Sequence, residues 1–198
     1  MSQRPALGCL FEIVETLALT LIIFFVIQTF IAQPYRVEQQ SMEQTLEPDQ
    51  YVLVDKLTPR FDSYKRGDIV VFNPPIDWIQ GEGTPFIKRV IGVAGDDVEI
   101  RDDGLVYVNN VALDEPYLFA VDGEQQPTTT STEPPRWTVA DGELFVMGDH
   151  RMSSSDSRTF GSIRIDNVIG RAWLRYWPFD TFTVLPTPTY PELQTSAP

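Results

Sequence analysis

The chain has 198 residues and a net charge of −13 at pH 7, which is enough length for one domain with an attached helix. Such an excess of acidic residues argues against a nucleic-acid partner, because phosphate binding requires clustered lysine and arginine. With one cysteine and one histidine, the chain has no internal disulfide framework and lacks the side chains of a typical zinc site, so we expect no metal and no cofactor.

The first predicted element is an apolar helix over residues 16–35. This stretch contains no charged residue, and as a helix it spans about 30 Å, the thickness of a bilayer core. A cleaved signal sequence needs small residues before the cut, and only Ala32 is available near the end of the run. We therefore predict an uncleaved transmembrane anchor with the lipid bilayer as a partner. A buried helix of a soluble protein is the alternative.

The rest of the chain predicts a β-rich domain over residues 36–179. Short apolar runs that end at turn residues predict strands at 51–54, 69–72, 85–93, 144–147 and 168–176. The runs 98–100 and 105–108 flank Asp102-Asp103-Gly104 and predict a hairpin. Residues 114–136 are rich in Pro, Thr and Gln and predict a surface loop, while the proline-rich tail, residues 180–198, is predicted to be disordered.

Ser41 is the first candidate for chemistry. It follows the predicted anchor after a short exposed segment, so it could act on a chain that is still in the membrane. A serine hydroxyl is a poor nucleophile until a base takes its proton, and either His150 or a lysine could supply that base. In most proteins such a serine is an ordinary surface hydroxyl.

Lys88 is the second candidate, because it lies inside an apolar strand beside Arg89. Alternate residues of a strand share a face, so one of these two cations must face apolar side chains. Burial disfavours the charged amine and can lower its pKa from ~10.4 by several units, which predicts a base that works near neutral pH. The alternative is an edge-strand lysine whose amine reaches solvent.

The third candidate is the segment 147–158, which combines glycine with many short polar side chains. This composition is typical of a loop that hydrogen-bonds its own backbone. Within it, two salt bridges are predicted to fix the loop, formed among Asp149, Arg151, Asp156 and Arg158. A solvated surface loop of mixed charge is the alternative.

Together these stretches resemble the type I signal peptidases, the membrane-bound Ser/Lys proteases that remove secretory signal peptides. The resemblance runs from the anchor to about Phe179. The matching pieces, in order, are Ser41-Met42 with Thr45-Leu46, residues 66–72, residues 88–92 with 95–96, and residues 148–151 with Ser154, Asp156, Ser157 and Arg158. It implies a mainly β fold: a coiled antiparallel β-sheet catalytic domain with a small inserted β region at 96–144, preceded by one transmembrane helix.

The resemblance also implies roles for individual residues. Ser41 would be the nucleophile and Lys88 the general base, while Ser154 would orient the Lys88 amine and Asp156 and Arg158 would hold the loop. Two shallow pockets would accept small substrate residues at the first and third positions before the cleaved bond. The first would be formed by Val37, Met42, Leu46, Phe86 and Ile87, and the third by Tyr35, Val71 and Ile87.

The sequence departs from the family pattern around the nucleophile. Gln44 stands where the family usually has proline, which leaves the following turn less constrained. Gln39 and Gln40 stand where small residues are common. The Ser41 backbone N–H would be one oxyanion donor, and the Gln39 amide is the candidate for the second.

The resemblance implies that the substrates are secretory preproteins, cleaved after small residues such as Ala-X-Ala. It further implies a single-pass protein of the bacterial cytoplasmic membrane, with residues 1–15 in the cytoplasm and the catalytic domain outside. We expect a monomer, since nothing in the sequence indicates an oligomer.

Three other functions remain open from the residues. A Ser/His/Asp hydrolase would use His150 in place of Lys88. A self-cleaving repressor shares the Ser/Lys pair but carries a DNA-binding domain where this chain has its apolar run. A membrane-anchored β module with a degraded active site would bind exported chains without cutting them.

Overall fold

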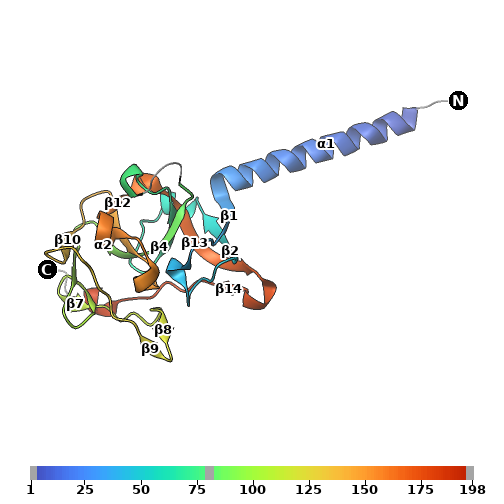
Figure 1. Cartoon of the computed structure of the whole chain (residues 1–198). Helices are drawn as coiled ribbons and strands as arrows, with labels where there is room; N and C mark the ends of the chain where they lie inside the picture. Colours follow the sequence, from blue (N-terminus) through green and yellow to red (C-terminus); the bar gives the residue numbers. More distant parts are fainter. Residues whose placement is uncertain (1–3, 79–82, 195–198) are drawn as a thin grey trace.

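The structure, a computed structural model, describes residues 4–78 and 83–194, and one long N-terminal helix stands apart from a β-rich body (Figure 1). Residues 1–3 of the predicted cytoplasmic segment and 195–198 of the predicted tail lie outside the described residues. The predicted fold class, mainly β with antiparallel sheets behind one N-terminal apolar helix, is confirmed.

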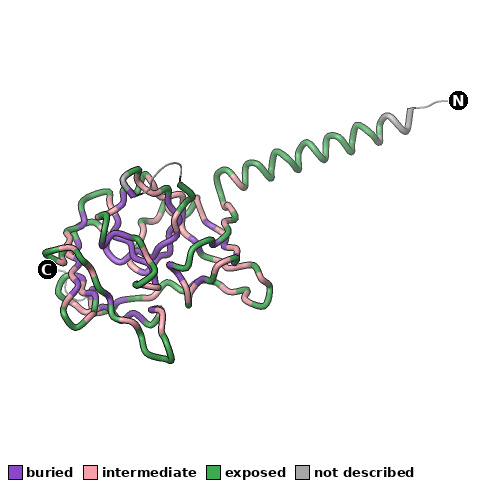
Figure 2. Tube along the Cα trace, in the orientation of Figure 1, coloured by how far each residue is buried: buried purple, intermediate pink, exposed green. Residues whose placement is uncertain are grey.

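The N-terminal helix α1 spans Arg4–Val26 and continues as a π-helical turn at Ile27–Ile31. The stretch Leu10–Ile31 is long and apolar enough to cross a membrane, with a mean hydropathy of 2.4. Figure 2 shows α1 exposed along its described length. Compared with Leu10–Ile31, the predicted span of 16–35 therefore lies too far toward the C-terminus. Residues 32–35 belong to a strand instead, where Pro34 is tolerated because that strand is at the edge of its sheet.

The largest sheet has the strand order β1-β2-β13-β3-β4-β11-β12, with β14 paired to β13. All neighbouring strands in it are antiparallel. The bounds are β1 Ala32–Arg36, β2 Tyr51–Asp55, β3 Ile69–Phe72, β4 Phe86–Val93, β11 Glu143–Met147, β12 Ile163–Arg164, β13 Val168–Trp177 and β14 Thr183–Val184.

Two smaller sheets lie between β4 and β11 in the chain, within the segment predicted as an inserted region. One has the order β10-β5-β6-β7 and the other is the β8–β9 hairpin. Their bounds are β5 Asp97–Ile100, β6 Val106–Val108, β7 Val111–Ala112, β8 Ala120–Val121, β9 Glu124–Gln125 and β10 Arg136–Thr138.

Short helical turns connect the strands. Those with 3-10 geometry are η2 Gln40–Met42, η3 Thr58–Arg60, η4 Ile76–Trp78, η5 Arg151–Ser153, η6 Ile165–Asn167 and η7 Phe179–Thr181. Two four-residue α-helices complete the fold, α2 Ser157–Phe160 and α3 Pro191–Gln194.

Apolar side chains pack on both faces of the large sheet, which explains why β3 is a continuous apolar run and not an alternating one. Ile69 and Val71 face a cluster beneath the 40–46 turn, whereas Val70 and Phe72 face a second cluster that includes Trp78. Residue 41 thus rests on a packed core, which fixes its position relative to β4.

The tail contradicts the prediction of disorder over residues 183–194. Leu185 joins the cluster beneath the 40–46 turn, while Tyr190 and Leu193 pack against the second sheet. Pro186 and Pro188 lie in the stretch between β14 and α3, where no ladder hydrogen bonds are needed, and Pro191 is the first residue of α3. The three apolar side chains supply the burial that a disordered tail lacks.

Replacing Tyr190 with alanine is expected to lower the free energy of unfolding by about 3 kcal/mol, because a large, buried aromatic ring is removed. Its hydroxyl also shares a hydrogen bond of 3.0 Å with the Tyr117 hydroxyl. Urea denaturation of the protein in detergent measures the change. Thr189→Ala, at the exposed neighbouring position, is the control, and equal stability of the two variants would contradict the packed tail.

Candidate active site

The segment that carries Ser41 is fixed by buried neighbours. Ser41 lies in the 3-10 turn η2, between Val37 and Leu46, and both of these side chains are buried in the core with Met42. The Ser41 carbonyl accepts the His150 N–H at 3.0 Å, which ties the turn to the 148–158 loop. Packing from below and this hydrogen bond together fix the position of the hydroxyl.

The Lys88 amine reaches the Ser41 hydroxyl. Lys88 lies on β4 with only 1% of its surface exposed, and its Nζ donates to Ser41 Oγ at 2.6 Å and to the Ile87 carbonyl at 3.1 Å. Within residues 4–78 and 83–194, no other side chain hydrogen-bonds to Ser41 Oγ. The structure thus brings together the two residues that the sequence singled out.

Burial lowers the pKa of Lys88 from its ordinary 10.5 to about 8. The negative charges of Asp156 and Asp149 raise the pKa, so they limit this shift, and the positive charge of Arg158 adds to it. With a pKa near 8, about one amine in ten is neutral at pH 7, compared with roughly one in several thousand for an exposed lysine. The site therefore holds a lysine that can accept a proton.

The 148–158 loop is held by the buried ion pair of Asp156 and Arg158, in which Arg158 Nε lies 2.8 Å from Asp156 Oδ1. Asp156 also accepts hydrogen bonds from the Gly148 N–H and the Ser154 hydroxyl. Burial alone would raise the pKa of Asp156, but the hydrogen bond and charge of Arg158 outweigh it and the pKa is lowered. Asp156 stays ionised and keeps the loop against Ser41.

Ser154 does not make the predicted hydrogen bond to Lys88. Its hydroxyl donates to Asp156 Oδ2 at 2.6 Å, and the side-chain hydrogen bonds of Lys88 go to Ser41 and the Ile87 carbonyl. A hydroxyl that donates to Asp156 can still accept, so the predicted bond is missing because the Lys88 amine donates elsewhere. Ser154 nevertheless lies beside the nucleophile, since its Oγ and the Ser41 carbonyl oxygen both lie close to Gly148.

Only one of the two salt bridges predicted within the loop forms. Asp149 pairs instead with Arg89 at 2.6 Å, and Arg151 pairs with Glu115 at 2.5 Å, all four side chains being buried. Asp149 additionally accepts the Thr45 hydroxyl, four residues after the nucleophile. Sequence reasoning missed Arg89 and Glu115; for Arg89 the signal was the second cation in an apolar strand, whose cost of burial requires a partner.

The described contacts of the His150 side chain are with residues other than Ser41. Its Nδ1 lies 2.6 Å from Glu43 Oε2, its ring stacks on Phe119, and its Nε2 lies 3.3 Å from the Ser153 hydroxyl. Its contact with Ser41 is made by the backbone N–H. This geometry favours Lys88 over His150 as the base.

Two cavities lie at this site, and both have Glu38 and Gln39 on their walls. The first, of about 200 Å³, is lined by residues that include Tyr35, Val37, Val71 and Ile87. The second contains Ser41 itself, with Phe86 on its wall. Met42 and Leu46 were predicted to line a pocket, but both are completely buried in the core beneath the turn and line neither cavity.

The glutamines around Ser41 have different environments. Gln39 is exposed and lines both cavities, where its amide can face a bound substrate. Gln44 has a φ of +78°, which proline cannot adopt, and its Oε1 accepts the Ala120 N–H at 2.9 Å. The expectation that this turn is less constrained is wrong, because the β8–β9 hairpin holds it.

Comparisons of the chain with known proteins give consistent matches. The family model described as "Signal peptidase, peptidase S26" matches residues 10–177. The chain is 34% identical to signal peptidase IB of Staphylococcus aureus over 183 residues, covering 87% of this chain and 92% of that protein.

A second relative and a solved structure also match the chain. Probable signal peptidase I-2 of a Synechocystis species is 34% identical over 178 residues, covering 89% of this chain and 77% of that protein. A crystal structure of a signal peptidase I from Enterococcus faecalis V583 is 36% identical, with a TM-score of 0.43, and the match covers 56% of this chain and 97% of that one.

Proposed function

The chain belongs to the bacterial type I signal peptidase family, peptidase S26, and from that premise we propose that it removes signal peptides from secretory preproteins with a Ser41/Lys88 dyad. The observation that carries the proposal is the 2.6 Å contact between Lys88 Nζ and Ser41 Oγ in a buried setting. Membership of the family makes the chain a serine peptidase; the assignment of roles rests on this contact.

The proposed chemistry proceeds in two stages. Neutral Lys88 takes the Ser41 proton while Oγ attacks the scissile carbonyl, and the protonated amine then gives a proton to the leaving nitrogen. A water molecule, deprotonated by Lys88, hydrolyses the resulting acyl-enzyme. The Ser41 N–H and the Gln39 amide are the proposed donors to the oxyanion.

The first cavity supports a preference for a small side chain at one of the substrate positions before the cleaved bond. An extended substrate places alternate side chains on one side, so residues at the first and third positions before the bond can enter neighbouring cavities. The volume of about 200 Å³ and the apolar wall of Tyr35, Val71 and Ile87 suit a short aliphatic side chain. On this basis we propose cleavage after small residues, such as Ala-X-Ala.

The apolar helix α1 supports a membrane location. Its exposed apolar surface is consistent with anchoring in a bilayer, and β1 follows it directly. We propose that α1 spans the bacterial cytoplasmic membrane once, with the β domain on the outer side, where preproteins emerge.

Cleavage of a preprotein in liposomes by wild type, Ser41→Ala and His150→Asn tests the proposal. Wild type is expected to release a mature chain whose N-terminus, read by sequencing, follows a small-X-small segment. Ser41→Ala should be inactive, while His150→Asn should keep at least about a tenth of the activity, because the side chain does not touch Ser41.

Loss of activity in His150→Asn with full activity in Ser41→Ala would overturn the proposal. Binding of the preprotein by wild type without any cleavage would instead favour an anchored binding module.

A further inference from the structure

The segment from β1 to the residue before β2, residues 32–50, carries five charged side chains, and four of them are committed to partners. Arg36 and Asp49 form an ion pair at 2.6 Å, and Glu43 lies 2.6 Å from His150 Nδ1. Glu47 accepts the Gln44 N–H at 3.1 Å. The fifth, Glu38, is the exception.

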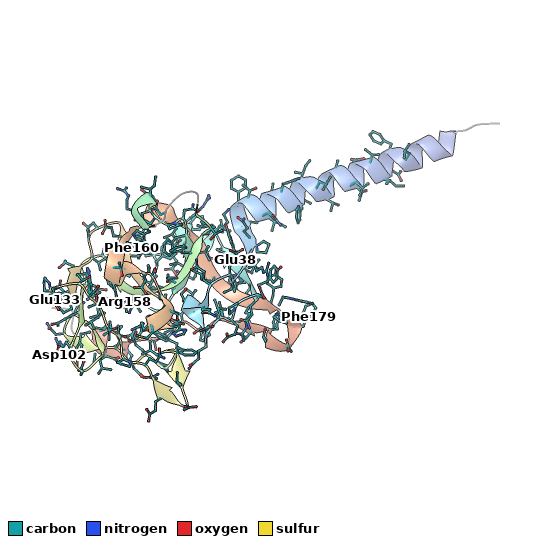
Figure 3. The ribbon with its side chains drawn as sticks, viewed as in Figure 1. Glu38, Asp102, Glu133, Arg158, Phe160 and Phe179 are labelled. Atoms are coloured by element: carbon teal, nitrogen blue, oxygen red, sulfur yellow. The ribbon has the colours of Figure 1, made fainter. Side chains whose placement is uncertain are left out.

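Glu38 is exposed and makes no hydrogen bond or ion pair with any residue in the described part of the chain. Asp49 makes the largest contribution to the raised pKa of Arg36, and Glu38 makes a small one. The charge of Arg36 is therefore balanced by Asp49 and not by Glu38. In Figure 3 Glu38 is labelled close to the exit of the anchor helix. Its carboxylate is therefore available to a bound chain.

Glu38 lines both cavities, a position that it shares with Gln39. The other residues around the cavity at Ser41 carry no charge: Gln39, Gln40, Ser41, Pro48, Phe86, Ser153 and Ser155. In the first cavity, the other charged residue is Arg36, which is paired with Asp49. Among the residues that the structure describes, Glu38 is thus the one unpaired negative charge on the walls of the two cavities.

We propose that Glu38 determines the charge preference of the peptidase at the second substrate position before the cleaved bond, favouring lysine or arginine and disfavouring aspartate or glutamate. This inference rests on the proposed function. When the first and third side chains enter the two cavities, strand alternation turns the second side chain out of the cleft toward solvent. Glu38 is exposed on the wall that both cavities share, so its carboxylate can meet a long charged side chain at that position.

The expected size of the effect follows from exposed ion pairs. Such pairs contribute modestly, and changing lysine to glutamate replaces an attraction by a repulsion, so kcat/KM should favour lysine by about three- to ten-fold. The preference should shrink at 1 M salt, where the Debye length falls to about 3 Å.

The experiment compares three preproteins that differ only at this position, which holds lysine, glutamine or glutamate. Each is cleaved by wild type, by Glu38→Gln and by Glu124→Gln. Glu124 lies exposed on the β8–β9 hairpin, lines neither cavity, and gives the same change in net charge. The expected result is a lysine-to-glutamate ratio of about three to ten for wild type and Glu124→Gln, and about one for Glu38→Gln.

An unchanged ratio in Glu38→Gln, or an equal loss in Glu124→Gln, would overturn the inference. Cleavage of the glutamine preprotein by wild type, and not by Ser41→Ala, separates this failure from failure of the proposed function. If wild type cleaves none of the three preproteins, both the proposed function and the role of Glu38 are wrong.

Discussion

Replacing Lys88 with methionine is expected to lower kcat by about 10⁴-fold or more, because the Ser41 hydroxyl loses its proton acceptor. Methionine keeps most of the stem of the side chain and fills the same buried space, so the loss reports the amine and not a cavity. Cleavage of a preprotein by the purified variant in detergent measures kcat. Residual activity above about a tenth of wild type would contradict the role of Lys88.

The same substitution is expected to raise the free energy of unfolding at pH 7, by up to about 3 kcal/mol. In the folded protein the pKa of Lys88 is about 8, below its ordinary 10.5, so folding disfavours the charged amine. This penalty is complete below pH 8, decreases as the pH rises from 8 to 10.5, and vanishes above that range. Urea denaturation at pH 7 and pH 10.5 should show the gain at the lower pH only.

The pH dependence of wild-type cleavage is a separate test of whether Lys88 is the base. If the neutral amine is the base, as proposed, the rate should rise as the pH increases and level off above about 8. A rate that is constant from pH 6 to pH 9 would show that Lys88 is not the group whose deprotonation limits cleavage.

Replacing Gly148 with alanine is expected to lower kcat by about 10²-fold or more. The added Cβ would lie 2.3 Å from Ser154 Oγ and 2.5 Å from the Ser41 carbonyl oxygen, so the loop and the nucleophile turn must separate. A displacement of about 1 Å at a catalytic group costs on the order of 10² in rate. Cleavage assays and urea denaturation, run together, measure the two consequences.

Gly142→Ala is the matched control for this substitution. Gly142 has open space around the position of a Cβ, but its φ of +77° costs alanine about 1 kcal/mol. This variant should therefore lose stability and keep its kcat. A Gly148→Ala protein with wild-type kcat would contradict the close approach of the two segments.

Local patterns predicted the strands β3 and β4, and Lys88 lies on the second of them. The four-residue apolar run became β3, and the run with two internal cations became β4, with Lys88 inward. Both predictions needed only the alternation of a strand and the cost of burying a charge. The resemblance to signal peptidases then related Ser41 to Lys88, 47 residues apart, which no local pattern does.

Pairings between distant residues could not be predicted. Asp149 binds Arg89, 60 residues away, and Arg151 binds Glu115, 36 residues away, whereas the sequence offered nearer partners for both. The tail was misjudged for a related reason. Its three buried apolar side chains are spaced irregularly among prolines, so they match neither a helix nor a strand period. Their burial becomes visible only in the folded structure.

The connection between α1 and the domain has no linker. Five of the nine residues between Ile31 and Ser41 are paired with β2, and Val37 is bonded to both Asp49 and Gln50. A flexible tether of nine residues would let its end wander over about 16 Å. If α1 spans a bilayer as proposed, Ser41 is instead held at one height above the lipid, and the protein selects a bond by its distance from the membrane as well as by the side chains beside it.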